Sequence, residues 1–175
     1  MIIVEELLWS PGRRGHVALP EADPLREPDA LQEAQLLAAR VEALSSTVGL
    51  LFELRTAMQL REANTAILVA RGVHEFTWWA EPRSTSKTAW NVVGSEPRPT
   101  NCPFEIDIDL VPRSRLRLVA ESAEFYVGDV EGLELQLPDY GIDDDATVRA
   151  NLADWRSSFS PMSATFLDRL ADRSP

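Results

Sequence analysis

The chain of 175 residues has only one cysteine (Cys102), two histidines and one lysine (Lys87). A single cysteine cannot form an internal disulfide, which is typical of a reducing compartment, and we expect a cytoplasmic protein. The N-terminus carries early acids and no positively charged region, so no signal peptide is indicated. No stretch reaches the about 20 apolar residues that a membrane-spanning helix needs. We therefore expect no membrane association.

Sequence motifs for nucleotide binding and nucleophilic catalysis are also missing. The chain has no P-loop, no G-x-G-x-x-G, no G-x-S-x-G and no C-x-x-C. His16 and His74 lie in unrelated contexts, and Glu75 cannot orient His74 because neighbours on a strand point to opposite faces. Cys102 has no evident base or helix start beside it to activate the thiol. The sequence predicts no catalytic residue and no cofactor, and it favours a non-enzymatic protein.

Negative charge is concentrated in one part of the chain. Residues 121–154 hold ten acids and one base, Arg149, and thus carry −9 of the formal net charge of −11. Such a local excess of negative charge usually marks a surface that binds a partner. Direct nucleic-acid binding is not expected, because phosphate contacts need clustered lysine and arginine. We predict a basic protein as the partner. The acidic residues expected at the interface are Glu131, Glu134, Asp139, Asp143, Asp144 and Asp145.

Two acidic patterns suggest metal binding, but each has a simpler explanation. The run Asp143 to Asp145, with Asp139, offers hard oxygen ligands, yet it lacks the glycine and glutamate spacing of a calcium loop. Acids at a helix start cap free N–H groups and face the positive end of the helix dipole. Asp107 and Asp109 alternate with apolar residues and fit a solvated strand face. We predict no metal site.

The pattern of elements predicts an α+β fold. With 45% hydrophobic and 26% charged residues, the chain resembles an ordinary globular protein. Residues 1–28 form an N-terminal strand and loop segment, and 29–175 form a single domain. We expect a mostly antiparallel sheet of about six to eight strands, flanked by an N-terminal helix and two C-terminal helices. The helices are expected at residues 30–44, 144–157 and 161–171.

Alternation of apolar and polar residues indicates the strands. Strands are expected at 47–54, 65–70, 73–81, 88–93, 103–120, 125–130 and 133–137. Residues 65–70 are apolar on both faces, which suggests a central strand covered on both sides. Residues 103–120 read as a hairpin with a three-residue loop. Leu110 should lie opposite Leu116 or a residue two away, and the simplest register places Asp109 opposite Arg117.

Trp79 is the aromatic candidate for an interface. Phe76, Trp78 and Ala80 share one face of the expected strand, which we assign to the core, whereas Trp79 shares its face with polar neighbours. An exposed tryptophan among charges can anchor an interface. The alternative is that a helix or the N-terminal segment covers Trp79.

Three stretches resemble small acidic α+β proteins of high-GC Gram-positive bacteria: VGLLFELR at 48–55, NTAILVARGV at 64–73 and EFYVGDV at 124–130. This resemblance implies no activity. In bulk properties alone, the chain is also similar to immunity proteins that neutralise basic toxins.

We predict a protein-interaction module that binds a basic partner, with a toxin-neutralising or regulatory role. One alternative is an enzyme or small-ligand binder with a pocket between sheet and helices, which would use Asp139 or Asp143 with His74. Another is a nucleic-acid mimic whose carboxylates stand in for phosphates. The oligomeric state is left open.

Overall fold

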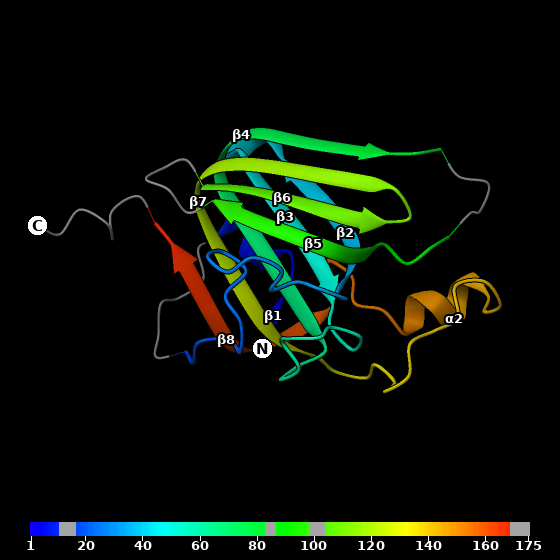
Figure 1. Ribbon diagram of the computed structural model, residues 1–175. Helices are drawn as coiled ribbons and strands as arrows, with labels where there is room; N and C mark the ends of the chain where they lie inside the picture. Colours follow the sequence, from blue (N-terminus) through cyan, green and yellow to red (C-terminus); the bar gives the residue numbers. More distant parts are fainter. Residues whose placement is uncertain (11–16, 83–86, 99–103, 169–175) are drawn as a thin grey trace, which may run out of the picture.

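The computed structural model describes residues 1–10, 17–82, 87–98 and 104–168, and most of them lie in one antiparallel sheet (Figure 1). The elements are β1 (Ile2–Ile3), α1 (Glu6–Trp9), β2 (Gln35–Glu42), the 3₁₀ helix η1 (Ala43–Ser45), β3 (Thr47–Glu53), β4 (Thr65–Ala80), β5 (Asn91–Arg98), β6 (Phe104–Val111), β7 (Ser114–Val130), α2 (Asp145–Ala150) and β8 (Ser158–Leu167).

The eight strands follow the order β1-β8-β7-β4-β3-β2-β5-β6, and β6 also pairs with β7. Six strands therefore close into a ring, and β8 and β1 extend the sheet beyond β7. The long strands β4 and β7 pair along their whole lengths and belong to both halves of the sheet. Both bend (Figure 1). In β4, Gly72 precedes the register shift between Val73 and Glu75 and has a φ of 62°, which glycine adopts without strain.

Two hydrophobic cores hold the fold together. The larger one fills the ring and includes Leu50, Phe52 and Phe125. The smaller one lies on the other face of β3, β4 and β7, where the N-terminal residues Leu7 and Leu8 cover it. The strand that is apolar on both faces, 65–70, is buried throughout because each core takes one of its faces. The cover on the outer face thus comes from α1 and irregular chain, without long helices.

The predicted α+β class is wrong, and the N-terminal helix is its first error. Residues 35–42 form β2, paired with β3, and the chain before them turns. Asp29 and Glu33 have φ values of 58° and 63°, which a right-handed helix cannot contain. The side chain of Asp29, expected as a helix cap, instead accepts from the Ser95 N–H at 3.1 Å. Tertiary pairing has overridden a local apolar spacing of three and four.

Both expected C-terminal helices are also corrected. The helix predicted at 144–157 is α2 alone and ends before Asn151. The first part of the helix predicted at 161–171 is instead strand: β8 ends at Leu167 and pairs with β7, and residues 169–171 lie outside the described residues. Pro161, expected at a helix start, lies opposite Gly128 where the register shifts by one residue. Proline is tolerated at such irregularities because no ladder N–H is required there.

The hairpin of β6 and β7 keeps the predicted faces but differs in register. Leu110 lies opposite Ser114, with three residues, 111–113, between them. Asp109 therefore faces Arg115, while Asp107 faces Arg117. The shift of two residues leaves every side chain on the face that the alternation indicated. Residues 133–137 are not a strand.

Candidate functional site

Nine of the ten acids of residues 121–154 fall into two groups, and the tenth, Asp154, follows them. Those on β7 are engaged within the fold. Glu124 binds Arg71 through both oxygens, at 3.0 and 3.2 Å, and lies 2.6 Å from the Tyr126 hydroxyl. Asp129 accepts from the Asn64 N–H at 3.0 Å. The other group follows β7: residues 131–148, which we call the acidic segment, hold six acids and no base.

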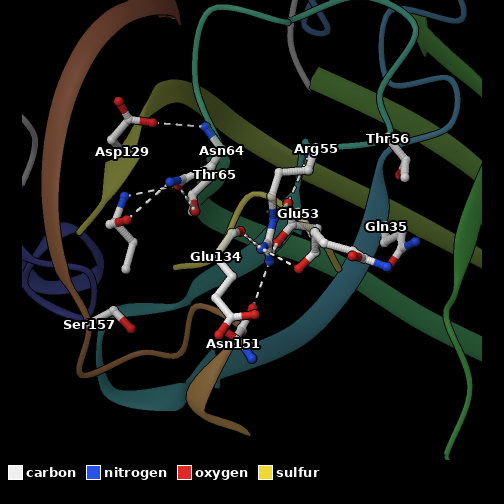
Figure 2. Close-up of polar contacts among 12 residues, drawn as sticks. Gln35, Glu53, Arg55, Thr56, Asn64, Thr65, Asp129, Glu134, Asn151 and Ser157 are labelled. Carbon is white, nitrogen blue, oxygen red and sulfur yellow. Dashed lines mark hydrogen bonds and ion pairs between the residues drawn. The ribbon is translucent and has the colours of Figure 1, made fainter. Parts of the chain in front are cut away.

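Arg55 holds the acidic segment on the sheet (Figure 2). It lies just beyond β3 and forms a bidentate pair with Glu53, with nitrogen–oxygen distances of 2.6 and 2.8 Å. Glu53 is 0% exposed and the Arg55 side chain is 10% exposed. The same guanidinium donates to the carbonyls of Glu134 and Asn151. One guanidinium therefore attaches the start of the segment, at Glu134, and the chain just after it, at Asn151, to the end of β3.

A second attachment is made by Tyr140. Its hydroxyl donates to the side-chain oxygen of Gln35 on β2 at 2.8 Å. Burial, with the nearby negative charge of Glu53, raises the pKa of Tyr140 to about 12. The phenol is therefore neutral at physiological pH and available as a donor.

Four of the predicted interface acids shape the segment locally. Asp139 accepts from the Gly141 N–H at 2.8 Å, and Asp143 accepts from the Asp139 N–H at 2.7 Å. Asp144 is the N-cap of α2 and accepts from the Thr147 N–H, and Asp145 pairs with Lys87 at 2.7 Å. These contacts match the capping explanation of the aspartate run.

Low pH should destabilise α2. Hydrogen bonding from the Thr147 N–H lowers the pKa of Asp144. Its folded-state pKa then lies below the unfolded value of about 4. The cap stabilises α2 above that value, and its contribution disappears as pH falls through the folded pKa. We expect the Asp144 carboxyl to titrate below pH 4 by carbon NMR, with faster amide exchange at Thr147 as it protonates.

The matched variant is Asp144→Asn, because asparagine also caps helices but does not titrate in this range. It should keep α2 at neutral pH and remove this acid dependence of Thr147 exchange. Titration of Asp144 at or above about pH 4 would contradict the capping geometry.

The acidic segment also presents apolar side chains to solvent. Leu135 is 99% exposed and Ile142 is 83% exposed. Glu131 and Glu134 are exposed beside Leu135 in the sequence. Isolated apolar residues are common on surfaces. Here, however, they stand among carboxylates on a segment that a buried ion pair fixes in place.

A groove of about 780 Å³ lies between this segment and the connection from β3 to β4. Its charged lining is mixed, with Arg55 and Arg61 on one side and Asp129, Glu131 and Glu134 on the other. The apolar lining residues are Leu54, Ala57, Met58, Ala63, Val130, Leu133 and Leu135.

Trp79 is exposed to 58% but does not lie with the acidic segment. It is near the end of β4 that pairs with the start of β7, opposite Arg115, whereas the acidic segment follows the far end of β7. Trp79 borders a hollow of about 380 Å³ with Arg98, Arg115 and Arg117. Trp78, assigned to the core, is 37% exposed and packs edge-on against Trp90 at 5.5 Å.

The arginines of that face already have partners. Arg117 pairs with Asp107 at 3.1 Å and with Glu105 at 3.0 Å, and Arg115 pairs with Asp109 at 3.3 Å. Nearby carboxylates, Asp107 first, raise the pKa of Arg117. The arginines of this face are therefore paired with carboxylates of the same face.

The groups named for an enzymatic alternative are not assembled. His74 is exposed on β4 with Glu121 at 3.8 Å, whereas Asp139 and Asp143 belong to the acidic segment. His16 and Cys102 lie outside the described residues. Within the described ranges, no group of three histidine, cysteine or acidic side chains is placed to hold a metal ion.

Sequence reasoning missed Glu53, Arg55 and Asn64. The signal was present: Glu53 is an acid inside the apolar run VGLLFEL, with Arg55 two residues later on the same face. A buried acid needs a partner. What the sequence could not show is that Arg55 also reaches carbonyls about 80 and 96 residues away in the chain.

No family model matches the chain, and neither the curated proteins nor the solved structures include a match to it. Among the described residues, no helix is both long and apolar enough to cross a membrane. The functional argument therefore depends on the acidic segment itself.

Proposed function

We propose that this protein is a non-enzymatic interaction module that binds a basic protein through the acidic segment. The observation that carries the proposal is the exposure of Leu135 and Ile142 among six acids. The carboxylates would attract and orient a cationic surface, and the two apolar side chains would enter shallow depressions on it. Neutralising a basic toxin and regulating a basic enzyme are two specific forms of this role.

Preorganisation supports the proposal. Binding by a loose loop loses affinity to the entropy of ordering it. Here Arg55, Tyr140 and the aspartate caps already hold the segment in one conformation. More of the contact energy can then contribute to affinity.

The negative charge of the segment also bears on the rate at which a basic partner would associate. Complementary charge mainly speeds association and selects the partner, and salt screens it over about 8–10 Å. We expect the association rate to fall steeply with added salt. The single cysteine fits a reducing compartment, and we propose that the module acts in the cytoplasm.

The test is affinity capture from a lysate of the native cells with matched double variants. Leu135→Ser/Ile142→Ser removes the two apolar side chains and keeps every charge. Leu19→Ser/Leu44→Ser is the control, because these residues are 79% and 93% exposed outside the acidic segment.

The wild type and the control should retain the same basic protein, and the Leu135/Ile142 variant should bind it at least about tenfold more weakly, as expected for interface anchors. Retention that is equal in all three proteins, or a retained partner that is acidic, would argue against the proposal.

A further inference from the structure

Among the described residues, the second half of β4, from Val73 to Ala80, has a neighbouring strand on only one side. Pairing with β3 ends at Arg71, while pairing with β7 continues to Ala80. In Figure 1 this part of β4 forms the upper rim of the sheet. Its side chains are exposed on both faces, in contrast to the buried first half. The exposed ones are His74, Glu75, Thr77, Trp78 and Trp79.

The backbone groups on the open side can be assigned. The Glu81 N–H donates to the Arg113 carbonyl at 3.0 Å, so the odd-numbered residues from Glu75 to Glu81 bond to β7, whereas the Val73 N–H, before the register shift, donates to the Ser46 carbonyl at 2.9 Å. In an antiparallel pair, bonded and non-bonded positions alternate. The N–H and C=O groups of the even-numbered residues therefore point to the open edge. After the register shift at His74, these residues are Phe76, Trp78 and Ala80.

The composition of this edge is unusual for a strand left in water. Natural edges are protected by charged side chains, above all lysine, by proline, by β-bulges or by short length. Here such protection is confined to the start of the stretch, at Glu75 and the register shift that precedes it. The stretch 74–80 reads HEFTWWA, with no lysine or proline and with three aromatic residues. An edge of this kind favours pairing with a further strand.

We propose that residues 74–80 pair antiparallel with the same residues of a second copy of this chain, with Thr77 on the two-fold axis. Phe76 then lies opposite Trp78 of the other copy on the inner face, and Thr77 lies opposite itself on the outer face. Aromatic pairs and threonine pairs are favourable across strands. Glu75 lies opposite Trp79, so no like charges are directly opposed.

Two nearby registers bring like charges together. Moving the axis to Glu75 places two glutamates opposite one another, and moving it to Trp78 places Glu75 opposite Glu81. Like charges directly opposite destabilise a sheet. The proposed dimer joins two sheets at their rims and leaves both acidic segments free, so it stands independently of the proposed function.

Introducing a charge at Thr77, on the proposed axis, tests the register. The Thr77 side chain is exposed, and its backbone bonds to β7 remain in any variant. By sedimentation, the wild type should be a dimer at about 100 μM, a concentration at which mass action reveals weak pairing. Thr77→Glu should raise the dissociation constant about tenfold or more. An equal mixture of Thr77→Glu and Thr77→Lys should restore the dimer.

A cross-link gives a second readout. Thr77 would be a non-bonded pair across the axis, with Cα atoms about 4.5 Å apart, close enough for a disulfide. In a Cys102→Ser background, Thr77→Cys should oxidise to a covalent dimer. Asp109→Cys, exposed on the outer face of β6, should not.

A monomeric wild type, a Thr77→Glu protein that still dimerises fully, or equal cross-linking at 77 and 109 would each overturn the proposal. Pairing with an extended peptide of another protein would appear as a monomeric wild type.

Discussion

Replacing Arg55 with methionine should lower the free energy of unfolding by about 3–5 kcal/mol, because breaking a buried ion pair leaves an uncompensated charge. The charge left behind is Glu53, which is fully buried. The variant also loses the donors to the Glu134 and Asn151 carbonyls, so the acidic segment should detach from β3. Urea unfolding measures the first effect, and hydrogen exchange over residues 131–151 measures the second.

Two controls separate charge burial from loss of an arginine. Arg156→Met removes an exposed guanidinium and should change stability by less than about 0.5 kcal/mol. Glu53→Gln combined with Arg55→Met removes both charges and should recover part of the stability lost by Arg55→Met, since no unpaired ion is left behind. A loss below about 1 kcal/mol for Arg55→Met would show that the pair is not the anchor described above.

The second large effect is expected at Gly128, where β7 meets β8. A Cβ atom at this position would lie 2.3 Å from the Ser160 carbonyl oxygen and 2.8 Å from the Phe159 ring. The carbonyl belongs to the paired strand and cannot move without breaking the ladder. Gly128→Ala should therefore lower the free energy of unfolding by about 3 kcal/mol, at the upper end of overpacking costs.

Gly94→Ala is the matched control, since Gly94 also lies beside a register shift. Its added Cβ would meet only the Asp29 carboxylate, at 3.7 Å. Thermal unfolding should show a change of less than about 0.5 kcal/mol. Equal losses at the two glycines would contradict the close contact of β7 and β8.

Strand alternation could be predicted from the sequence, and the helices could not. The strand 47–54 and the hairpin faces of 104–118 follow from a two-residue period that no helix can satisfy. The stretch 30–44 has helical spacing, yet the buried Leu31 and Leu36 serve a turn and a strand, because pairing with β3 outweighs propensity. The helix prediction was wrong at residues 158–167 for the same reason, because these residues pair with β7, which is distant in the sequence.

Only part of the candidate site could be predicted from the sequence. The acidic segment could be found from the sequence, because the charges of a stretch can be counted without knowing the fold. Its anchoring by Arg55 depends on contacts between residues far apart in sequence. The same limit applies to Trp79: its alternation indicated an outer face, but only the strand register separates it from the acids of residues 131–148.

Hydrogen exchange on the complex with the captured basic protein tests the central claim most directly. The account predicts that binding slows amide exchange within residues 131–148 and leaves residues 75–81 unchanged. Protection over the Trp79 face, with no change in residues 131–148, would contradict it.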